Sequence, residues 1–283
     1  MAVAHASSNR ALSGLAPLGA GLLALLVAAR APAQAHGPNV VTVITREFAY
    51  EFPDTLPSGL TTFHLHNEGK EPHHLMLYRL DSGKTLADVF AELSAGGPLP
   101  AWMHAAGGPN APPPGGDSYG TVVLEPGDYV AFCHVKSADR VLHFRKGMLR
   151  RLTVTASPGP AAPLPPADLT VTLRDYGFAF SRPPTRGRHL IAVTNAGSQT
   201  HELILSRLAP GKKAEDFVAW LNTGKGPPPV RASGGTTDVA PGHSMVIAVD
   251  LEPGRYSAVC RVRDARDGQT HDRHGMRLDF AVR

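Results

Sequence analysis

The stretch LEPGDYVAFC, from Leu124 to Cys133, recurs as LEPGRYSAVC, from Leu251 to Cys260. Upstream of it the chain matches itself without gaps at an offset of 128 over about fifty residues. The matched positions share their residue type or character, with Phe48, Tyr50, Phe52, Asn67, His73 and Asp88 falling on Tyr176, Phe178, Phe180, Asn195, His201 and Asp216. The chain is therefore an internal duplication of one domain.

Each copy has the pattern of short β-strands. Val40–Thr45 and Thr61–His66, like Leu169–Leu173 and His189–Thr194, alternate β-branched or apolar residues with polar ones. One short helix per copy is expected at 86–93 and 214–221, where apolar residues recur at helical spacing and glycines follow. These patterns, without βαβ alternation, predict an all-β fold of two small sandwiches.

Composition shifts predict the domain boundaries. The segment ASPGPAAPLPP, Ala156 to Pro166, is too rich in Pro and Ala to pack, so residues 156–167 are expected to link domain 1 (36–155) to domain 2 (168–283). Within domain 1 we expect a long Pro/Gly loop from Gly96 to Gly116.

Residues 1–35 have the pattern of a signal peptide. Met1–Arg10 carries no acidic residue, 11–29 is an uncharged run rich in Leu, Ala and Gly, and Ala33-Gln34-Ala35 resembles a signal-peptidase site. Cleavage there makes His36 the mature N-terminus and predicts a periplasmic or secreted protein. The alternative is an uncleaved anchor, the one case in which we expect a membrane association.

The charge distribution argues against nucleic acid as a partner. The formal net charge is +4, and the Lys and Arg residues are interspersed with acids rather than gathered on one basic run. No Ser/His/Asp arrangement or Gly-rich phosphate loop is spaced well enough to nominate.

Each copy carries one His early and then a Cys, a His and a Met late. The two sets are His73, Cys133, His143, Met148 and His201, Cys260, His271, Met276. The second His and the Met are five residues apart in both copies, inside HFRKGM and HDRHGM. Two imidazoles and a thiolate in a trigonal plane, with a weak axial thioether, suit copper in both of its oxidation states.

In these residues both copies resemble the cupredoxin family, which includes plastocyanin and rusticyanin, over 40–155 and 168–283. The resemblance implies Greek-key β-sandwiches, one type 1 copper per domain, and single-electron transfer to a redox partner protein. It implies that the eight residues of the two sets are the copper ligands. One departure is the interval from Cys to the second His, ten residues in one copy and eleven in the other, which is longer than in familiar members and predicts a looser or non-blue site.

Several alternatives stay open at this stage. A Cys133–Cys260 disulfide would destroy both sites. The protein is expected to carry electrons, or else to handle and store copper, or to be a metal-free binding module. We predict that it is not an enzyme, because the copies supply too few histidines for a second copper centre between them.

Other histidines are not assigned to these sites. His74 meets Glu202 and His134 meets Arg261 in the second copy, so both are expected to be neighbours rather than ligands. His64 and His66 meet Ala192 and Thr194, which favours a solvent-facing pair. His36 is an N-terminal candidate for copper only if the signal is cleaved, and His104 with Met103 is placed at a site edge or in a mobile loop.

Overall fold

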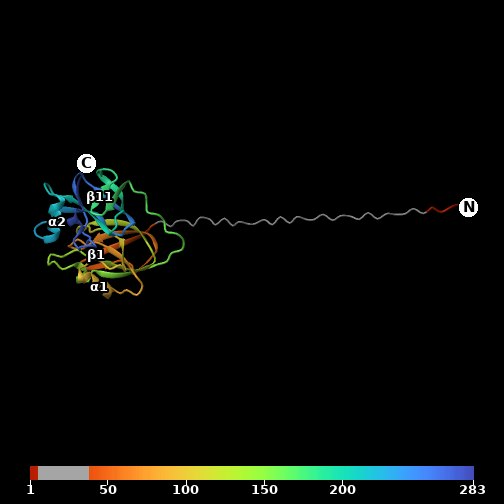
Figure 1. Ribbon diagram of the computed structural model, residues 1–283, viewed down its shortest axis with the longest axis horizontal. Coiled ribbons are helices and arrows are strands. Elements are labelled where there is room, and N and C mark those ends of the chain that lie inside the picture. Colours follow the sequence, from red (N-terminus) through yellow and green to blue (C-terminus); the bar gives the residue numbers. More distant parts are fainter. Residues whose placement is uncertain (6–37) are drawn as a thin grey trace. The chain divides into compact units, whose positions relative to one another are not determined.

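The computed structural model describes residues 1–5 and 38–283 (Figure 1). Most of the predicted signal peptide, and His36, lie outside the described residues. Neither α-helix in the described part of the chain has the length and apolar character that crossing a bilayer requires.

Within the described residues, the N-terminal half contains nine strands, one α-helix and one 3-10 turn: β1 (Asn39–Arg46), β2 (Ala49–Glu51), β3 (Thr55–Pro57), β4 (Gly59–Asn67), β5 (Met76–Leu80), α1 (Leu86–Ala95), β6 (Met103–Gly107), β7 (Asp117–Leu124), β8 (Gly127–Phe132), η1 (His143–Lys146) and β9 (Leu149–Thr155). The C-terminal half contains β10 (Leu169–Arg174), β11 (Gly177–Phe180), β12 (Gly187–Asn195), β13 (His201–Leu208), α2 (Ala214–Thr223), β14 (Val230–Val239), β15 (Ser244–Leu251), β16 (Gly254–Val259), η2 (His271–His274) and β17 (Arg277–Val282). The predicted all-β fold, duplicated and with one short helix in each half, is confirmed.

The same strand pairing recurs in both halves. β1 lies parallel to β4 and forms a hairpin with β2, and β10 lies parallel to β12 and forms a hairpin with β11. The alternation seen in the sequence places Val41 and Val43 of β1 in the core, and their neighbours toward solvent. Each half therefore repeats one frame on which corresponding residues occupy corresponding places.

The helices begin where local chemistry favours it. Thr85 caps α1 by accepting a hydrogen bond from the Asp88 backbone N–H, while Asp88 accepts one from the Thr85 N–H. Gly96 ends the helix in the left-handed conformation, as Gly224 ends α2. Both helices extend two residues beyond their predicted ends.

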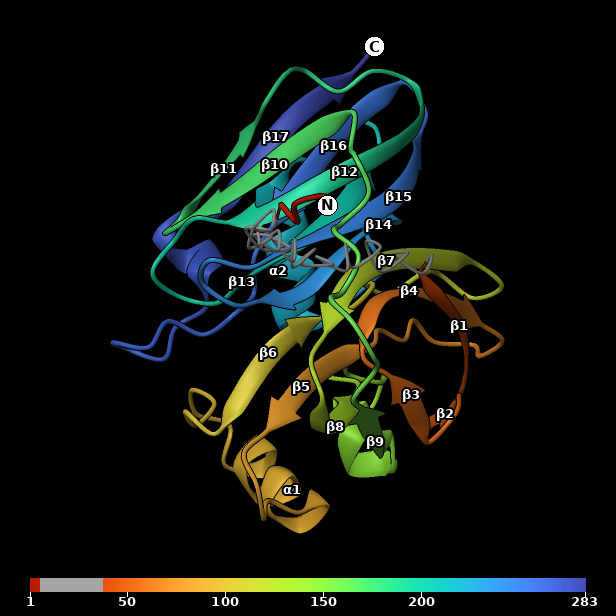
Figure 2. The same cartoon turned by 90° about the vertical axis from the view of Figure 1, so that its right-hand side faces the viewer.

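The two halves share both sheets. β15 of the second half pairs with β7 of the first through Val246↔Thr121 and the next two positions, and β14 pairs with β6 at Val239↔Ala106 (Figure 2). The result is one eight-stranded sheet, in the order β11-β10-β12-β15-β7-β4-β1-β2, and one nine-stranded sheet, in the order β17-β16-β13-β14-β6-β5-β8-β9-β3. The repeat alone did not predict this continuity.

No side chain fits at Gly108, which lies beside the junction of the two halves. A Cβ there would lie 2.0 Å from the Leu75 carbonyl oxygen, and its φ is +138°. The Gly108 carbonyl accepts from the Thr237 backbone N–H at 2.8 Å. Glycine is therefore required at this position, whose carbonyl also contacts the second half.

The predicted loop from Gly96 to Gly116 is wrong in part, because it contains β6. This strand pairs with β5, Leu80 lying opposite Met103 and Arg79 opposite His104. The sequence MHAAG lacks the β-branched alternation that marks a strand, and its pairing partner lies far along the chain. His104 is consequently held at the surface by Asp81, with Nε2 and Oδ1 2.8 Å apart, and Met103 is buried.

Candidate metal centres

The four residues of each predicted set come from corresponding places in the two halves. His73 lies between β4 and β5, and His201 begins β13. Each Cys follows directly on a strand, Cys133 on β8 and Cys260 on β16, and each second His begins a 3-10 turn, η1 or η2. The backbone N–H of Cys133 donates to the Met148 carbonyl at 3.2 Å, and that of Cys260 to the Met276 carbonyl at 3.2 Å.

The structure brings the His, Cys and His side chains of each half together. In the first half, Nδ1 of His73 lies 3.0 Å from Nδ1 of His143, which lies 3.5 Å from Sγ of Cys133. In the second half, the corresponding distances are 3.0 Å (His201 to His271) and 3.5 Å (His271 to Cys260). All eight side chains of the two sets, the methionines included, are fully buried.

The long interval from Cys to the second His does not loosen the site. A bridge between Lys136 and Leu142, and its counterpart between Arg263 and Thr270, closes the extra residues into a small hairpin. The backbone N–H of His143 then donates to the Val135 carbonyl at 2.9 Å. The additional residues form a hairpin whose two ends lie close together. The second His therefore lies beside the Cys despite the long interval.

Each of the four histidines has a carboxylate beside its far nitrogen, Nε2. His143 lies 2.8 Å from Glu71 Oε2 and His201 lies 2.9 Å from Asp175 Oδ1. The other two pairs are wider, with 3.6 Å from His73 to Glu47 Oε1 and 4.0 Å from His271 to Asp264 Oδ2. A carboxylate at this position favours a hydrogen on Nε2 and leaves Nδ1 with a free lone pair.

Sequence reasoning missed these carboxylates, although the repeat marks one pair of them. Glu47 and Asp175 occupy matched positions in the hairpin turns β1–β2 and β10–β11. The next residue in each turn, Phe48 or Tyr176, has a positive φ of 67° or 68° and packs its ring against His143 or His271. An aromatic residue in this conformation is unusual, and here the turn sets both an acid and an aromatic ring against the same pair of histidines.

The second pair of carboxylates cannot be found by matching the copies, because the acid has changed position. Glu71 meets Gln199 in the second copy, and Asp264 meets Ser137 in the first when the copies are matched on their Cys residues. In the second half Gln199 Nε2 donates to Asp264 Oδ2 at 3.0 Å. The second carboxylate thus comes from a different one of two adjoining loops in each half. Each half retains one such carboxylate.

The hydrogen-bonding pattern leaves each site incomplete without a cation. When the closer carboxylate fixes a hydrogen on His143 Nε2, His73 must donate from Nδ1, and its own Nε2 is then left buried without a partner. The second half repeats this with His201 and His271, whose Nε2 is likewise buried and unpartnered. If all four Nε2 atoms carry hydrogen, each site presents two facing Nδ1 lone pairs, which a metal ion would satisfy.

The donor spacing is close to what a small metal ion requires. Three donors in a plane, with bonds of about 2.0–2.3 Å, lie roughly 3.5–4 Å apart. The Cys-to-His distances are 3.5 Å in both halves and 4.0 Å from Cys260 Sγ to His201 Nδ1. Only the distance between the imidazole nitrogens, 3.0 Å, is shorter. The residues therefore fit a metal ion with little adjustment.

The protonation states also suit a cation. Burial lowers the pKa of all four histidines, that of His271 to about 4, so the imidazoles are neutral. Partial burial acts to raise the pKa of Asp175, but hydrogen bonds from Ser198, His201 and the backbone lower it to about 2, so this carboxylate is ionised. Burial raises the pKa of the Cys133 thiol to about 12, against backbone N–H groups of Val135 and His74 that lower it. A bound metal ion would replace that thiol proton.

Glycine is needed behind the first His of each site. A Cβ at Gly69 would lie 2.7 Å from both Glu47 Oε1 and His73 Nε2. A Cβ at Gly197 would lie 2.5 Å from Asp175 Oδ1 and 2.6 Å from His201 Nε2. Neither glycine has a positive φ, so space, not backbone conformation, requires it.

The remaining candidates lie outside the two clusters. Cys133 and Cys260 are both free, each in its own half. The structure therefore does not contain the disulfide that was considered as an alternative. His134 stacks on Phe144, with ring centroids 5.8 Å apart, and His74 accepts a hydrogen bond from the Tyr50 hydroxyl at its backbone carbonyl. Neither belongs to the groups of converging ligand atoms. His64 and His66 are half-buried and meet Asp117, rather than only facing solvent.

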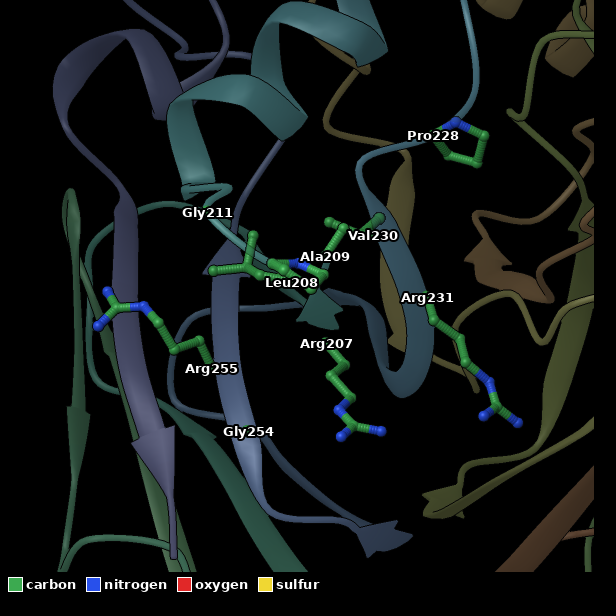
Figure 3. A pocket seen from close by; sticks show the side chains of 10 residues that line it. Arg207, Leu208, Ala209, Gly211, Pro228, Val230, Arg231, Gly254 and Arg255 are labelled. Atoms are coloured by element: carbon green, nitrogen blue, oxygen red, sulfur yellow. The ribbon is translucent and has the colours of Figure 1, made fainter.

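A hollow of about 490 Å³ in the second half is lined by three arginines, Arg207, Arg231 and Arg255 (Figure 3). Arg207 is paired with Glu252, and Arg255 lies 3.9 Å from Asp279. Their side chains diverge in Figure 3 instead of pointing at one centre. This hollow is separate from the buried clusters and adds no ligand to them.

Comparison with known proteins found similar structures but no related family. No protein-family model matches the chain, and no curated protein matches it. A reduced auracyanin from Roseiflexus castenholzii is 25% identical over 42% of this chain and 99% of its own, with a TM-score of 0.30. A copper nitrite reductase from Nitrosomonas europaea is 13% identical over 87% of this chain and 94% of its own, with a TM-score of 0.25.

The prediction that the chain is not an enzyme is contradicted by these comparisons. Enzymes are among the structures that match most of the chain: besides the nitrite reductase, a multicopper oxidase matches over 86% of it, at 13% identity and a TM-score of 0.25. The prediction relied on counting histidines in the sequence, which does not take account of carboxylate ligands or of sites shared between copies of a chain. We therefore withdraw it.

Proposed function

We propose that this chain binds copper in its two buried clusters and transfers single electrons through them. The observation that carries the proposal is the pair of facing Nδ1 atoms beside a Cys sulfur, found twice on one repeated frame. Copper held by two imidazoles and a thiolate supplies a one-electron couple.

The protein's own part in electron transfer is to hold the ligands still. Both cysteines lie in the core directly after a strand, and both second histidines are fixed by backbone hydrogen bonds to the segment that follows the Cys. Ligands that keep their positions when the oxidation state changes make electron transfer fast, because little reorganisation is needed. Met148 and Met276, both of which are fully buried, would supply a weak thioether ligand.

The test is reconstitution of the full chain with Cu²⁺, followed by metal analysis and visible absorption. We expect two copper ions per chain and an intense thiolate-to-copper absorption, of which Cys133→Ser and Cys260→Ser each remove about half, since one thiolate serves each site. His104→Gln is the matched control, because it removes an exposed histidine with one carboxylate partner and should leave both quantities unchanged.

The outcomes separate the remaining functions. Reversible reduction by one electron per copper would support electron transfer. Copper binding without the intense absorption, and with ready loss to a chelator, would instead favour copper handling or storage. No stoichiometric copper after reconstitution would refute the proposal and leave a metal-free binding module.

We also propose that the protein works outside the cytoplasm and exchanges electrons with a partner protein. The support is the uncharged segment 11–29 and the Ala33-Gln34-Ala35 site in the sequence. Sequencing the N-terminus of protein recovered from the periplasm or medium should give His36 as the first residue. Recovery of the uncut chain from the membrane fraction would support the anchored alternative.

A further inference from the structure

A third group of ligand atoms lies away from the two buried clusters. His64 and His66 are two residues apart on β4, so both project from the same face of the sheet. Asp117, on the neighbouring strand β7, lies directly opposite His66 in the strand register. Oδ1 of Asp117 lies 2.6 Å from His64 Nε2 and 2.9 Å from His66 Nδ1.

The three side chains are all partly exposed to solvent. Their side chains are 27%, 35% and 42% exposed, in the order His64, His66, Asp117. His64 is held in place by stacking on Tyr119, with ring centroids 4.6 Å apart and planes 7° from parallel. Two imidazoles and one carboxylate at roughly this spacing form a common ligand set for divalent transition metals.

The duplication shows that the sheet does not need these residues. The same three places on the second frame hold Ala192, Thr194 and Ser244, and Thr194 lies opposite Ser244 as His66 lies opposite Asp117. There, the Ser244 hydroxyl donates to the Thr194 hydroxyl at 2.9 Å. A pair of hydroxyls is therefore enough to pair the two strands at this place. Two imidazoles and a carboxylate are not needed for the fold at any of the three positions.

We propose that His64, His66 and Asp117 form a third metal site, which binds a divalent first-row transition metal ion at the surface. Among these ions Cu²⁺ binds nitrogen and oxygen ligands most tightly, followed by its neighbours in the series. Binding requires only that each ring hydrogen, now shared with Asp117, moves to the other nitrogen of the same ring. The remaining positions on the ion face water, which distinguishes this exchangeable site from the two buried ones.

The experiment fills the buried clusters first and then titrates the surface. The full chain is loaded with Cu⁺, which prefers thiolate ligands, and is then titrated with Zn²⁺, which accepts imidazole and carboxylate, while the heat of binding is measured. We expect one Zn²⁺ per chain. Titration with Cu²⁺ should then give one added paramagnetic ion whose spectrum shows coupling to nitrogen.

The decisive variant replaces the three residues by their counterparts, His64→Ala, His66→Thr and Asp117→Ser. The second half shows that this frame accepts them, and we expect the loss of one equivalent of Zn²⁺. Asp117→Asn, which keeps the shape of the side chain, should weaken binding about tenfold or more. The control His104→Gln should retain the full equivalent.

The inference does not depend on copper in the buried clusters, because it is read from the difference between the parent chain and the triple variant. Should the buried clusters take no Cu⁺, any Zn²⁺ they bind would be the same in both proteins. Equal binding by the parent and the triple variant, or no binding at the surface of the parent, would overturn it.

Discussion

Gly197→Ala tests how the second buried cluster depends on the carboxylate behind His201. The added Cβ would lie 2.5 Å from Asp175 Oδ1 and 2.6 Å from His201 Nε2. Since ordinary contact begins near 3.4 Å, the imidazole and the carboxylate must each move by roughly 0.8–0.9 Å. The backbone itself accepts alanine at this position, so the strain falls on these two side chains.

The expected result is a selective loss of metal binding with a modest loss of stability. Displacing the partner of a ligating histidine costs about 10–100-fold in metal affinity, and crowding a packed site costs about 1–3 kcal/mol of unfolding free energy. The first cluster should be unaffected, because it has its own glycine, Gly69. Copper affinity and absorption of each site, together with urea unfolding, measure both effects.

Two variants make the comparison specific. Gly69→Ala should produce the mirror result, weakening the first cluster and sparing the second, since its Cβ would lie 2.7 Å from His73 Nε2. Gly177→Ala is the control, because nothing lies within 4 Å of its added Cβ. If Gly197→Ala folds and still binds copper at the second site as tightly as the parent chain, the carboxylate does not hold His201, and the reasoning is refuted.

Three further predictions concern single positions. Burial raises the pKa of Asp238 to about 6, against a hydrogen bond from Tyr78 that lowers it. Below about pH 6 the folded protein therefore holds a proton there, and stability should fall as pH rises from about 4 through about 6. Asp238→Asn should remove this part of the dependence, on the order of 3 kcal/mol, in unfolding measured at pH 4 and pH 8, and an unchanged pH profile would contradict it. Glu71→Gln should weaken copper binding at the first cluster about 10–100-fold, and adding Ser137→Asp should restore it, as metal titration would show; no rescue would mean that the two loops are not interchangeable. Val43→Ala, at a fully buried position, should lower the unfolding free energy by about 2 kcal/mol in urea without changing metal content, and a loss of metal would contradict this separation of core and site.

The sequence predicted most of the frame because its signals are local and occur twice. The strands around Val43 and its counterpart Val171 follow from alternation, and the helices from spacing and terminal glycines. The two candidate sets were recognised because a Cys, a His and a Met recur at nearly equal spacing after an earlier His. The features that the sequence could not predict depend on contacts between distant segments. The residues of β6 do not alternate between apolar and polar, and the two sheets continue from one half to the other only through the pairing of edge strands.

The carboxylates show a second limit, which is chemical. Glu47 and Asp175 are repeated, yet an acid in a hairpin turn is ordinary at the surface and draws no attention without the histidine behind it. Glu71 and Asp264 are not repeated at all, because one acid has been replaced by Gln199 while another has appeared in the adjoining loop. When the two copies are compared position by position, these substitutions look like two unrelated changes. The structure shows that each half retains one carboxylate beside the histidines.

That exchange also indicates what the two clusters have in common. The residue that supplies the second carboxylate differs, and so does its distance from the imidazole, 2.8 Å in the first half and 4.0 Å in the second. What both halves keep is a carboxylate near Nε2 of each histidine, which favours hydrogen on Nε2 and so frees both Nδ1 atoms to bind a cation. A structural role for the histidines would be met by one hydrogen bond between the two Nδ1 atoms, but that arrangement leaves one buried Nε2 in each half without a hydrogen-bond partner. Because the acid is retained when its position is not, the clusters are better explained by a requirement for two unprotonated nitrogens than by packing, and that requirement is the one a metal ion imposes.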